Sequence, residues 1–160
     1  MKTTIKIGSQ LLELEANAFT PILYRRVFHS DFIRSFTDII SMNKELVEKA
    51  TEIKALKESF EAGEITNEEY TKRTSEFNFS SDEMDFIYER AELLSQLAFI
   101  MNAQSKESDV RELTKLDVND FYSFLMDFDD GDFRDGVVIS KIIAFWKGNA
   151  EDSDVEAKNE

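Results

Sequence analysis

The chain has 160 residues, 42% of them hydrophobic, and contains no cysteine, which excludes disulfides, thiolate zinc sites and cysteine nucleophiles. Its 33 acidic residues outnumber 19 basic ones and give a net charge of −14, a balance that repels nucleic acid phosphates and anionic membranes. The sequence shows neither a signal peptide nor a run approaching the ~20 apolar residues of a membrane span. We therefore expect an intracellular protein that binds neither nucleic acid nor membrane.

The first fifteen residues alternate between apolar and polar positions, which predicts two β-strands. Between them, Gly8-Ser9 suits a two-residue type II′ turn, so a hairpin is expected over residues 3–15. The predicted cross-strand pairs are Ile5 with Leu12, Thr3 with Leu14 and Lys2 with Glu15. A lone hairpin is marginally stable in water, so its apolar face is expected to pack on helices or on another subunit.

Helices are expected from about residue 21 onward. Thr20 is a good N-cap, and Pro21, the only proline, suits the first helical position. This helix is expected to break near His29-Ser30, and Ser30-Asp31 can start the next one. A longer polar helix follows, for which Gly63 is a plausible end.

Two further helix starts are indicated by capping-box spacing. The capping pairs are Thr66 with Glu69 and Ser80 with Glu83. The second helix carries the most regular amphipathic pattern of the chain, from Met84 to Met101. The polar residues that follow, Asn102 to Asp109, predict a linker.

The C-terminal part is expected to contain two helices and a tail. Asp117 predicts the cap of a short helix, Asp129-Asp130-Gly131-Asp132 predicts a loop with Gly136 as a further loop residue, and a last helix covers 138–146. Residues 149–160 are almost devoid of large apolar side chains and should be disordered. The predicted fold is thus mainly α: a single mostly helical domain over 1–148 that opens with the hairpin, followed by a disordered acidic tail.

The sequence lacks the patterns of an active site or a metal site. The single histidine, His29, is followed by Ser30 and Asp31, but members of a catalytic triad converge from separated segments. The Asp-rich stretch 127–136 lacks the ligand spacing of an EF-hand. We therefore expect no catalytic residue, no bound metal and no cofactor, and the chain is not expected to be an enzyme.

A candidate partner-binding surface comes from the helix expected between Met84 and Met101. Beside its main apolar stripe this helix carries a second set of apolar positions: Phe86, Leu93, Leu97 and Ile100. A helix that is apolar around much of its girth is either fully buried or leaves an exposed apolar patch, and such patches commonly mark binding sites. Both interpretations, a partner-binding surface and a buried central helix, stay open at this point.

The opening of the chain combines a short alternating hairpin with a helix that starts at Thr-Pro and carries an aromatic-Arg pair. The segments that show this are Thr4-Ile5-Lys6-Ile7-Gly8, Leu12-Glu13-Leu14-Glu15, Thr20-Pro21-Ile22-Leu23-Tyr24-Arg25-Arg26-Val27-Phe28 and Asp31-Phe32. This opening resembles that of the tail assembly chaperones of long-tailed bacteriophages (siphophages) of Gram-positive hosts. His29 stands where glycine often stands in that family. The resemblance is good over residues 1–45 and extends to the remainder only in general character.

The resemblance implies a role in virion assembly in the cytoplasm of the bacterial host. Members of this family bind the long, hydrophobic tape measure protein, keep it soluble and help tail tube subunits polymerise around it, and they are not part of the mature virion. Ring or spiral assemblies within the family imply a homo-oligomer. Many members are made in two forms through a ribosomal frameshift, and this chain would be the short form.

Two other classes of function compete with this interpretation. The alternative is a small acidic protein-binding or regulatory protein, including a DNA mimic, which would arrange its carboxylates in a phosphate-like double row. A chaperone instead needs an exposed apolar patch or groove. A deep pocket with convergent polar groups would favour an enzyme.

Overall fold

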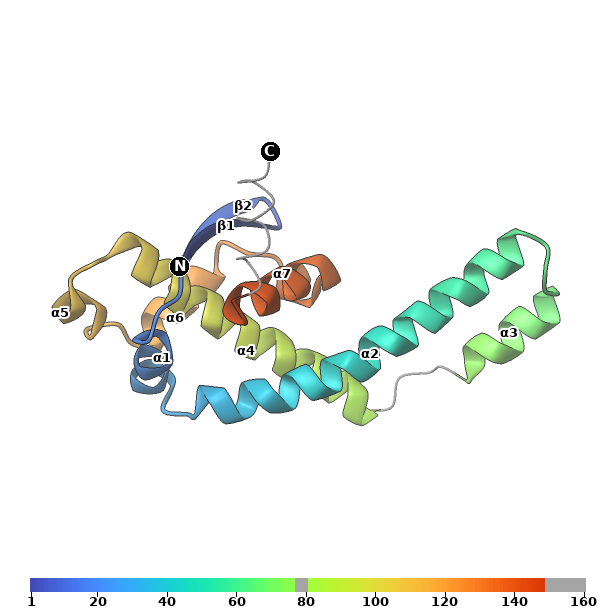
Figure 1. Cartoon of the computed structure of the whole chain (residues 1–160), viewed down its shortest axis with the longest axis horizontal. Helices are drawn as coiled ribbons and strands as arrows, with labels where there is room; N and C mark the ends of the chain where they lie inside the picture. The colour runs from blue at the N-terminus through green and yellow to red at the C-terminus, as the bar shows by residue number, and fades with distance from the viewer. Residues whose placement is uncertain (77–80, 149–160) are drawn as a thin grey trace. The chain divides into compact units, whose positions relative to one another are not determined.

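The computed structural model describes residues 1–76 and 81–148. They form a mainly α protein with one two-stranded antiparallel hairpin at the N-terminus (Figure 1), which confirms these two parts of the predicted fold. The predicted disordered tail, 149–160, and the predicted cap Ser80 lie outside the described residues. In the part of the chain that the structure describes, no helix is long and apolar enough to cross a membrane.

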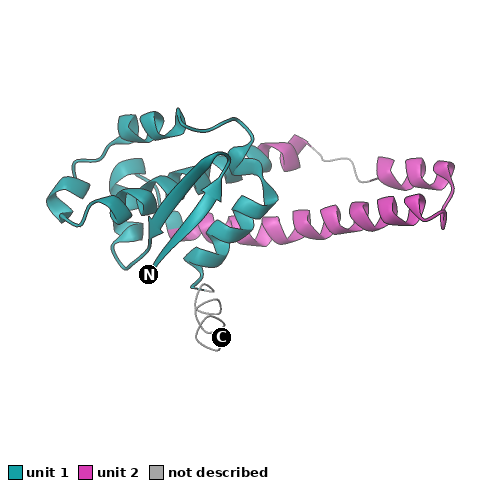
Figure 2. Ribbon diagram, turned by 90° about the horizontal axis from the view of Figure 1, so that it is seen from above, with its two compact units in different colours: residues 1–32, 87–160 teal, residues 33–86 magenta. Residues whose placement is uncertain are grey.

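The range 1–148, for which the sequence predicts one domain, divides into two compact units (Figure 2). Unit 1 combines Met1–Phe32 with Ile87–Glu160, and unit 2 is Ile33–Phe86. Within the described residues, unit 1 therefore joins the N-terminal segment to the part of the chain from Ile87 to residue 148, whereas unit 2 is an insertion between them.

The hairpin of unit 1 has the predicted register. Strand β1 (Lys2–Ile7) pairs antiparallel with β2 (Gln10–Glu15). The observed pairs include Ile5 with Leu12, Thr3 with Leu14 and Lys2 with Glu15. Gly8 has a φ of +59° while Ser9 has no positive φ, as a type II′ turn requires. The apolar face of the hairpin is buried, and α7 (Gly136–Trp146) packs against β1.

Helix α1 (Thr20–Phe28) begins differently from the prediction. Thr20 is the first helical residue and not the N-cap. Its hydroxyl donates a 2.7 Å hydrogen bond to Gln104 Oε1 and accepts one from the N–H of Asn17, not from a helical N–H. The side chain of Asn17 instead accepts from the N–H of Phe19 at 2.9 Å. The predicted end is confirmed: His29 adopts the left-handed conformation with φ 56°, and its N–H donates to Arg25 O.

Unit 2 consists mainly of α2 (Phe32–Glu61), α3 (Asn67–Ser75) and the first turns of α4. The structure forms one continuous helix where the sequence predicts two, because neither glycine nor proline interrupts 32–61. The predicted end at Gly63 fits its φ of 75°. The predicted cap of α3 is confirmed, since Thr66 Oγ1 accepts from the N–H of Glu69.

Helix α4 (Ser81–Lys106) extends well into the predicted linker, which is a correction. Its last turns bury two amide side chains that find polar partners. Asn102 Nδ2 donates to Glu13 O at 3.0 Å, and Gln104 Nε2 donates to Asn17 Oδ1 at 3.1 Å. The end of the predicted linker forms a short helix, α5 (Val110–Leu113).

The C-terminal elements follow their capping residues. Asp117 and its partner Asp120 form a capping box that starts α6 (Val118–Leu125), as predicted from Asp117. A loop and a 3₁₀ turn, η1 (Asp132–Arg134), precede α7. Gly136, predicted as a loop residue, is the first residue of α7, because Asp135 caps that helix by accepting from the N–H groups of its first turn.

The core of unit 1 is rich in aromatic rings. Tyr24 contacts Phe28 and Phe32, each with 5.0 Å between ring centroids, and Phe32 packs edge-on against Trp146. Phe28 continues the network to Phe121, at 5.1 Å and 88°. Such tilted and edge-to-face pairs add about 0.5–1.5 kcal/mol each beyond their buried area. This network fixes α1, α6 and α7 within unit 1.

Candidate partner-binding groove

The four predicted partner-binding residues lie in the protein interior. Their exposed fractions are 5% for Phe86, 7% for Leu93, and 0% for Leu97 and Ile100. A side chain buried in this way cannot contact another protein without local unfolding. We therefore assign these residues to the core, in agreement with the interpretation of a central buried helix, and not to a partner-binding surface.

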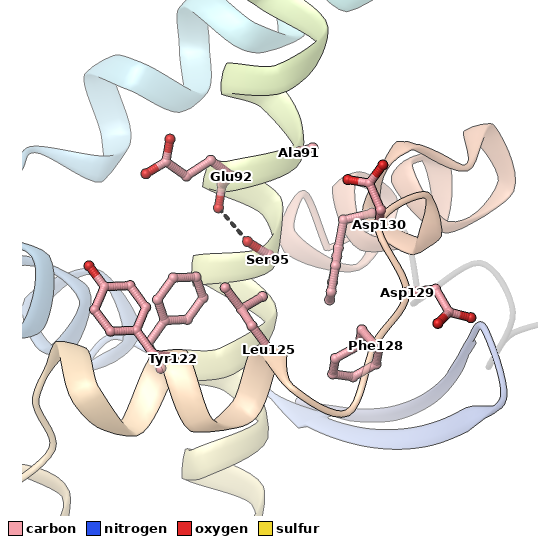
Figure 3. Close-up of a pocket in the computed structure, with 10 residues that line it drawn as sticks. Ala91, Glu92, Ser95, Tyr122, Leu125, Phe128, Asp129 and Asp130 are labelled. Carbon is pink, nitrogen blue, oxygen red and sulfur yellow. Dashed lines mark hydrogen bonds between the residues drawn. The ribbon is translucent and has the colours of Figure 1, made fainter.

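An open groove lies instead on unit 1, between α4 and the segment that runs from α6 to η1 (Figure 3). Its volume is about 380 Å³ and its lining is mostly apolar. The residues that line it are Ala91, Glu92, Ser95, Phe121, Tyr122, Leu125, Phe128, Asp129, Asp130 and Phe133. Because all ten belong to unit 1, the groove is complete within one compact unit.

The floor and the end wall of this groove are aromatic. Phe121 and Phe133 are buried, whereas Phe128 is half-buried and lies between Phe124, at 4.9 Å, and Phe133, at 5.0 Å. Phe99 supports this group from α4, with its ring centroid 5.5 Å from that of Phe124. Rings that pack against one another at several angles have few alternative rotamers, so the groove is largely preformed.

The rim of the groove is acidic. Glu92, Asp129 and Asp130 are exposed, and Tyr122 is 57% exposed beside them. Arg134 is the nearby cation, and its guanidinium already bonds the carboxylate of Asp130 at 2.6 Å. Two rim carboxylates, those of Glu92 and Asp129, therefore remain available to a partner: no hydrogen bond or ion pair involves their side chains in the described structure.

The polar groups inside the groove are bonded locally. The hydroxyl of Ser95 donates to Glu92 O on its own helix at 2.7 Å, as the dashed line in Figure 3 shows. Among the described residues, acidic and histidine side chains do not gather into a cluster of three or more that could hold a metal ion. What this groove offers chemically is an apolar hollow within a negative rim, which suits binding.

The wall formed by α4 is anchored to α1 through Tyr24. Its hydroxyl donates to Gln96 Oε1 at 2.5 Å. Burial raises the pKa of the Tyr24 phenol, and the negative charge of Glu92 raises it further against the opposing effect of a hydrogen bond with Ser30. The phenol therefore stays protonated, and so able to donate, throughout the physiological pH range.

The loop that carries Asp129 and Asp130 is held against the hairpin turn. The N–H of Asp129 donates to Asp132 Oδ2 at 2.8 Å. The carboxylate of Asp132 in turn lies over Gly8, where a Cβ would come within 2.7 Å of its Cγ. Glycine at this turn thus permits the close approach that positions one side of the groove.

A second hollow, of about 300 Å³, shares Phe128 with the first. It is lined by Gln10, Leu11, Leu12, Glu13, Asn102, Lys106, Phe124, Asp127 and Phe128. Leu11 is 73% exposed. Met126, which precedes the lining residue Asp127 in the chain, is 84% exposed. Because Phe128 lines both hollows, the two depressions adjoin at this residue.

Comparison with protein-family models, curated proteins and solved structures found no match. The functional interpretation therefore depends on the groove and on the resemblance of the N-terminal segment.

The groove residues appear in the sequence only as an ordinary amphipathic pattern. Phe121, Leu125 and Phe128 follow helical spacing, which is typical of a core-facing stripe. The structure divides this stripe, since Phe121 is buried while Leu125 and Phe128 stay half-exposed. The one sequence signal that points to this surface is the close succession of aromatic and acidic residues between 121 and 133.

Proposed function

We propose that this chain is a phage tail assembly chaperone, which binds the tape measure protein, keeps it soluble and promotes assembly of the tail tube around it. The observation that carries the proposal is the open, aromatic, preformed groove of unit 1. The proposed activity is binding without catalysis, exerted in the cytoplasm of the bacterial host before the virion is complete.

The N-terminal segment supports the proposal through a backbone requirement. In the resembled family a glycine often stands at the position of His29, and His29 adopts a left-handed φ of 56°. Glycine populates that conformation without strain, whereas other residues rarely do. The chain therefore keeps the backbone turn that the family's glycine allows, although the residue itself differs.

Apolar contact is proposed as the main source of affinity for the client. Large aromatic side chains bury much area with little loss of rotamer freedom, which makes them efficient contact residues. The net charge of −14 would keep the complex from aggregating while the apolar surfaces meet. A tail tube protein and further copies of this chain are the other proposed partners.

Co-expression tests the proposal. A tape measure protein encoded beside the gene for this chain should appear in the soluble fraction only when this chain, or its frameshifted form, is present. Tyr122→Asp should lower the soluble client several-fold, because it places a charge where an apolar side chain of the client would lie. Tyr122 is 57% exposed, so this variant should stay folded, as circular dichroism would verify.

The matched control is Val110→Asp. Val110 is also in unit 1 and 53% exposed, but it does not line the groove. It should leave client solubility unchanged. If both variants act alike, the groove is not the binding surface. If the client is equally insoluble with and without the wild-type chain, the chaperone proposal fails and a small acidic regulatory protein becomes the better interpretation.

A further inference from the structure

We infer that the groove selects amphipathic helices whose apolar side chains are flanked by Lys or Arg. This inference rests on the proposed function and specifies the chemistry of the client segment. It starts from the two hollows, of about 380 and 300 Å³, that meet at Phe128. Two depressions side by side suit two large apolar side chains on one face of a helix, as at positions i and i+4 or i and i+7.

The charges around both hollows have one predominant sign. Glu92, Asp129 and Asp130 line the first hollow, and Glu13 and Asp127 line the second. The cations beside them are Arg134, which is bonded to Asp130, and Lys106. Five carboxylates against two cations leave a negative field over an apolar floor.

This field decides between the candidate occupants. A second copy of this chain carries a net charge of −14 and would bring further carboxylates to the rim. A helix with acidic flanks meets the same repulsion, and like charges across an interface disfavour the wrong partner strongly. Lys and Arg flanks pair with the rim carboxylates while their aliphatic stems cover the aromatic edges. A basic-flanked helix is therefore the favoured occupant.

The rim carboxylates differ in what they can give to a partner. Asp130 is occupied by Arg134, and the backbone of Asp129 holds the loop through Asp132. The carboxylate groups of Glu92 and Asp129 have no such internal partner among the described residues. These two side chains should carry the selectivity of the first hollow, and amide replacements remove their charge at nearly constant shape.

Two synthetic amphipathic peptides, with identical apolar positions and either Lys or Glu at the flanking positions, test this inference against the full-length protein. Fluorescence anisotropy at low salt should show the Lys peptide binding at least about tenfold more tightly, which corresponds to about 1.4 kcal/mol. The preference should shrink as salt is raised, because the rim charges are exposed to solvent.

The double variant Glu92→Gln with Asp129→Asn should clearly reduce the preference, because it removes two of the four carboxylates that have no cation bonded to them, and it should keep the helical content of the wild type. The matched control is Glu45→Gln with Glu48→Gln, which removes the same charge from exposed positions of α2 that line neither hollow. This control should keep the preference. Equal binding of the two peptides, or equal effects of the two double variants, would overturn the inference.

The outcomes of the peptide experiment and the co-expression experiment distinguish failure of this inference from failure of the proposed function. If the wild-type chain solubilises its client but binds both peptides alike, the charge selectivity is wrong and the chaperone proposal stands. If the Lys peptide is selected but no client is solubilised, the chemistry of the groove is right and the chaperone proposal is wrong.

Discussion

At the scale of single residues, Gly8 links the hairpin turn to the groove. Its φ of +59° favours glycine, and a Cβ would lie 2.7 Å from the carboxyl carbon of Asp132. Alanine would add about 1–2 kcal/mol of backbone strain. It would also displace the Asp132 side chain from its hydrogen bond with Asp129 N–H, worth about 1 kcal/mol. Gly8→Ala should therefore lower the free energy of unfolding by about 2–3 kcal/mol.

Urea denaturation measures this loss, and the chain offers a matched control. Gly136→Ala places the same methyl group at the first position of α7, where φ is not positive and no atom lies within 4 Å. That variant should be neutral or gain about 0.5–1 kcal/mol, since alanine suits a helix better than glycine. A Gly8→Ala protein as stable as the wild type would contradict the assigned turn and loop contact.

Two buried amide side chains could not be predicted from the local sequence. Asn102 and Gln104 look like linker residues because their side chains are polar. Both are buried at the end of α4, and they bond Glu13 O and Asn17 Oδ1. These partners lie 89 and 87 residues away in the sequence, so no local pattern reveals them. Burying an amide is favourable only when such a partner exists.

At the scale of elements, local sequence patterns predict the hairpin register and several helix starts, but not the groove. The hairpin register follows from strict alternation around Gly8-Ser9, and the starts of α3 and α6 follow from the caps Thr66 and Asp117. The groove is different, because α4, α6 and the loop before η1 form it together. The packing of these elements determines which residues of the aromatic stripe from Phe121 to Phe128 stay exposed. No local sequence pattern predicts this packing.

Helix α3 depends on a few contacts of unit 2. It has no buried residue, and its Tyr70 stacks on Phe60 of α2 with ring centroids 4.7 Å apart and nearly parallel planes. An aromatic pair contributes about 0.5–1.5 kcal/mol beyond its buried area. Tyr70→Ala should therefore speed hydrogen exchange of α3 amides by about tenfold or more, through easier local opening.

The same exchange experiment contains its controls. Amides of α6 in unit 1 should keep their protection in Tyr70→Ala, and the exposed Lys72→Ala in α3 should leave α3 nearly as protected as in the wild type. Uniform loss of protection over both units would show that they open as one, against this prediction.

At the scale of the whole molecule, the hairpin carries basic side chains although the chain as a whole is strongly acidic. A net charge of −14 makes copies of the chain repel one another. The exposed face of β1 is an exception to this charge, because it carries Lys2 and Lys6. The two edges of the hairpin also differ. Glu13 O at the β2 edge accepts from Asn102 and Ser105 of α4, which occupies that edge. A further strand would therefore have to pair with β1.

Self-association through β1 is the prediction that follows for the intact chain. Because Ile7 and Gln10 flank a two-residue turn, they form a hydrogen-bonded pair, and the alternation turns the main-chain groups of Thr4 and Lys6 outward. Among the described residues none hydrogen-bonds these outward groups. An unpaired edge of this kind is a template for pairing with another chain. In an antiparallel pair of β1 strands centred on Thr4, Lys2 of one copy would face Lys6 of the other.

Thr4→Pro tests this arrangement with little risk to the fold, since the N–H that proline removes is not used within the hairpin. Analytical ultracentrifugation at micromolar concentration should find oligomers of the wild type and an 18.5 kDa monomer of Thr4→Pro, with Thr4→Val as the control that still associates. Facing lysines repel, so added salt should strengthen this association, whereas it should weaken selection of the Lys peptide at the groove. A wild-type protein that stays monomeric would contradict the predicted self-association. A Thr4→Pro variant that assembles as the wild type does would place the contact between copies on a surface other than β1.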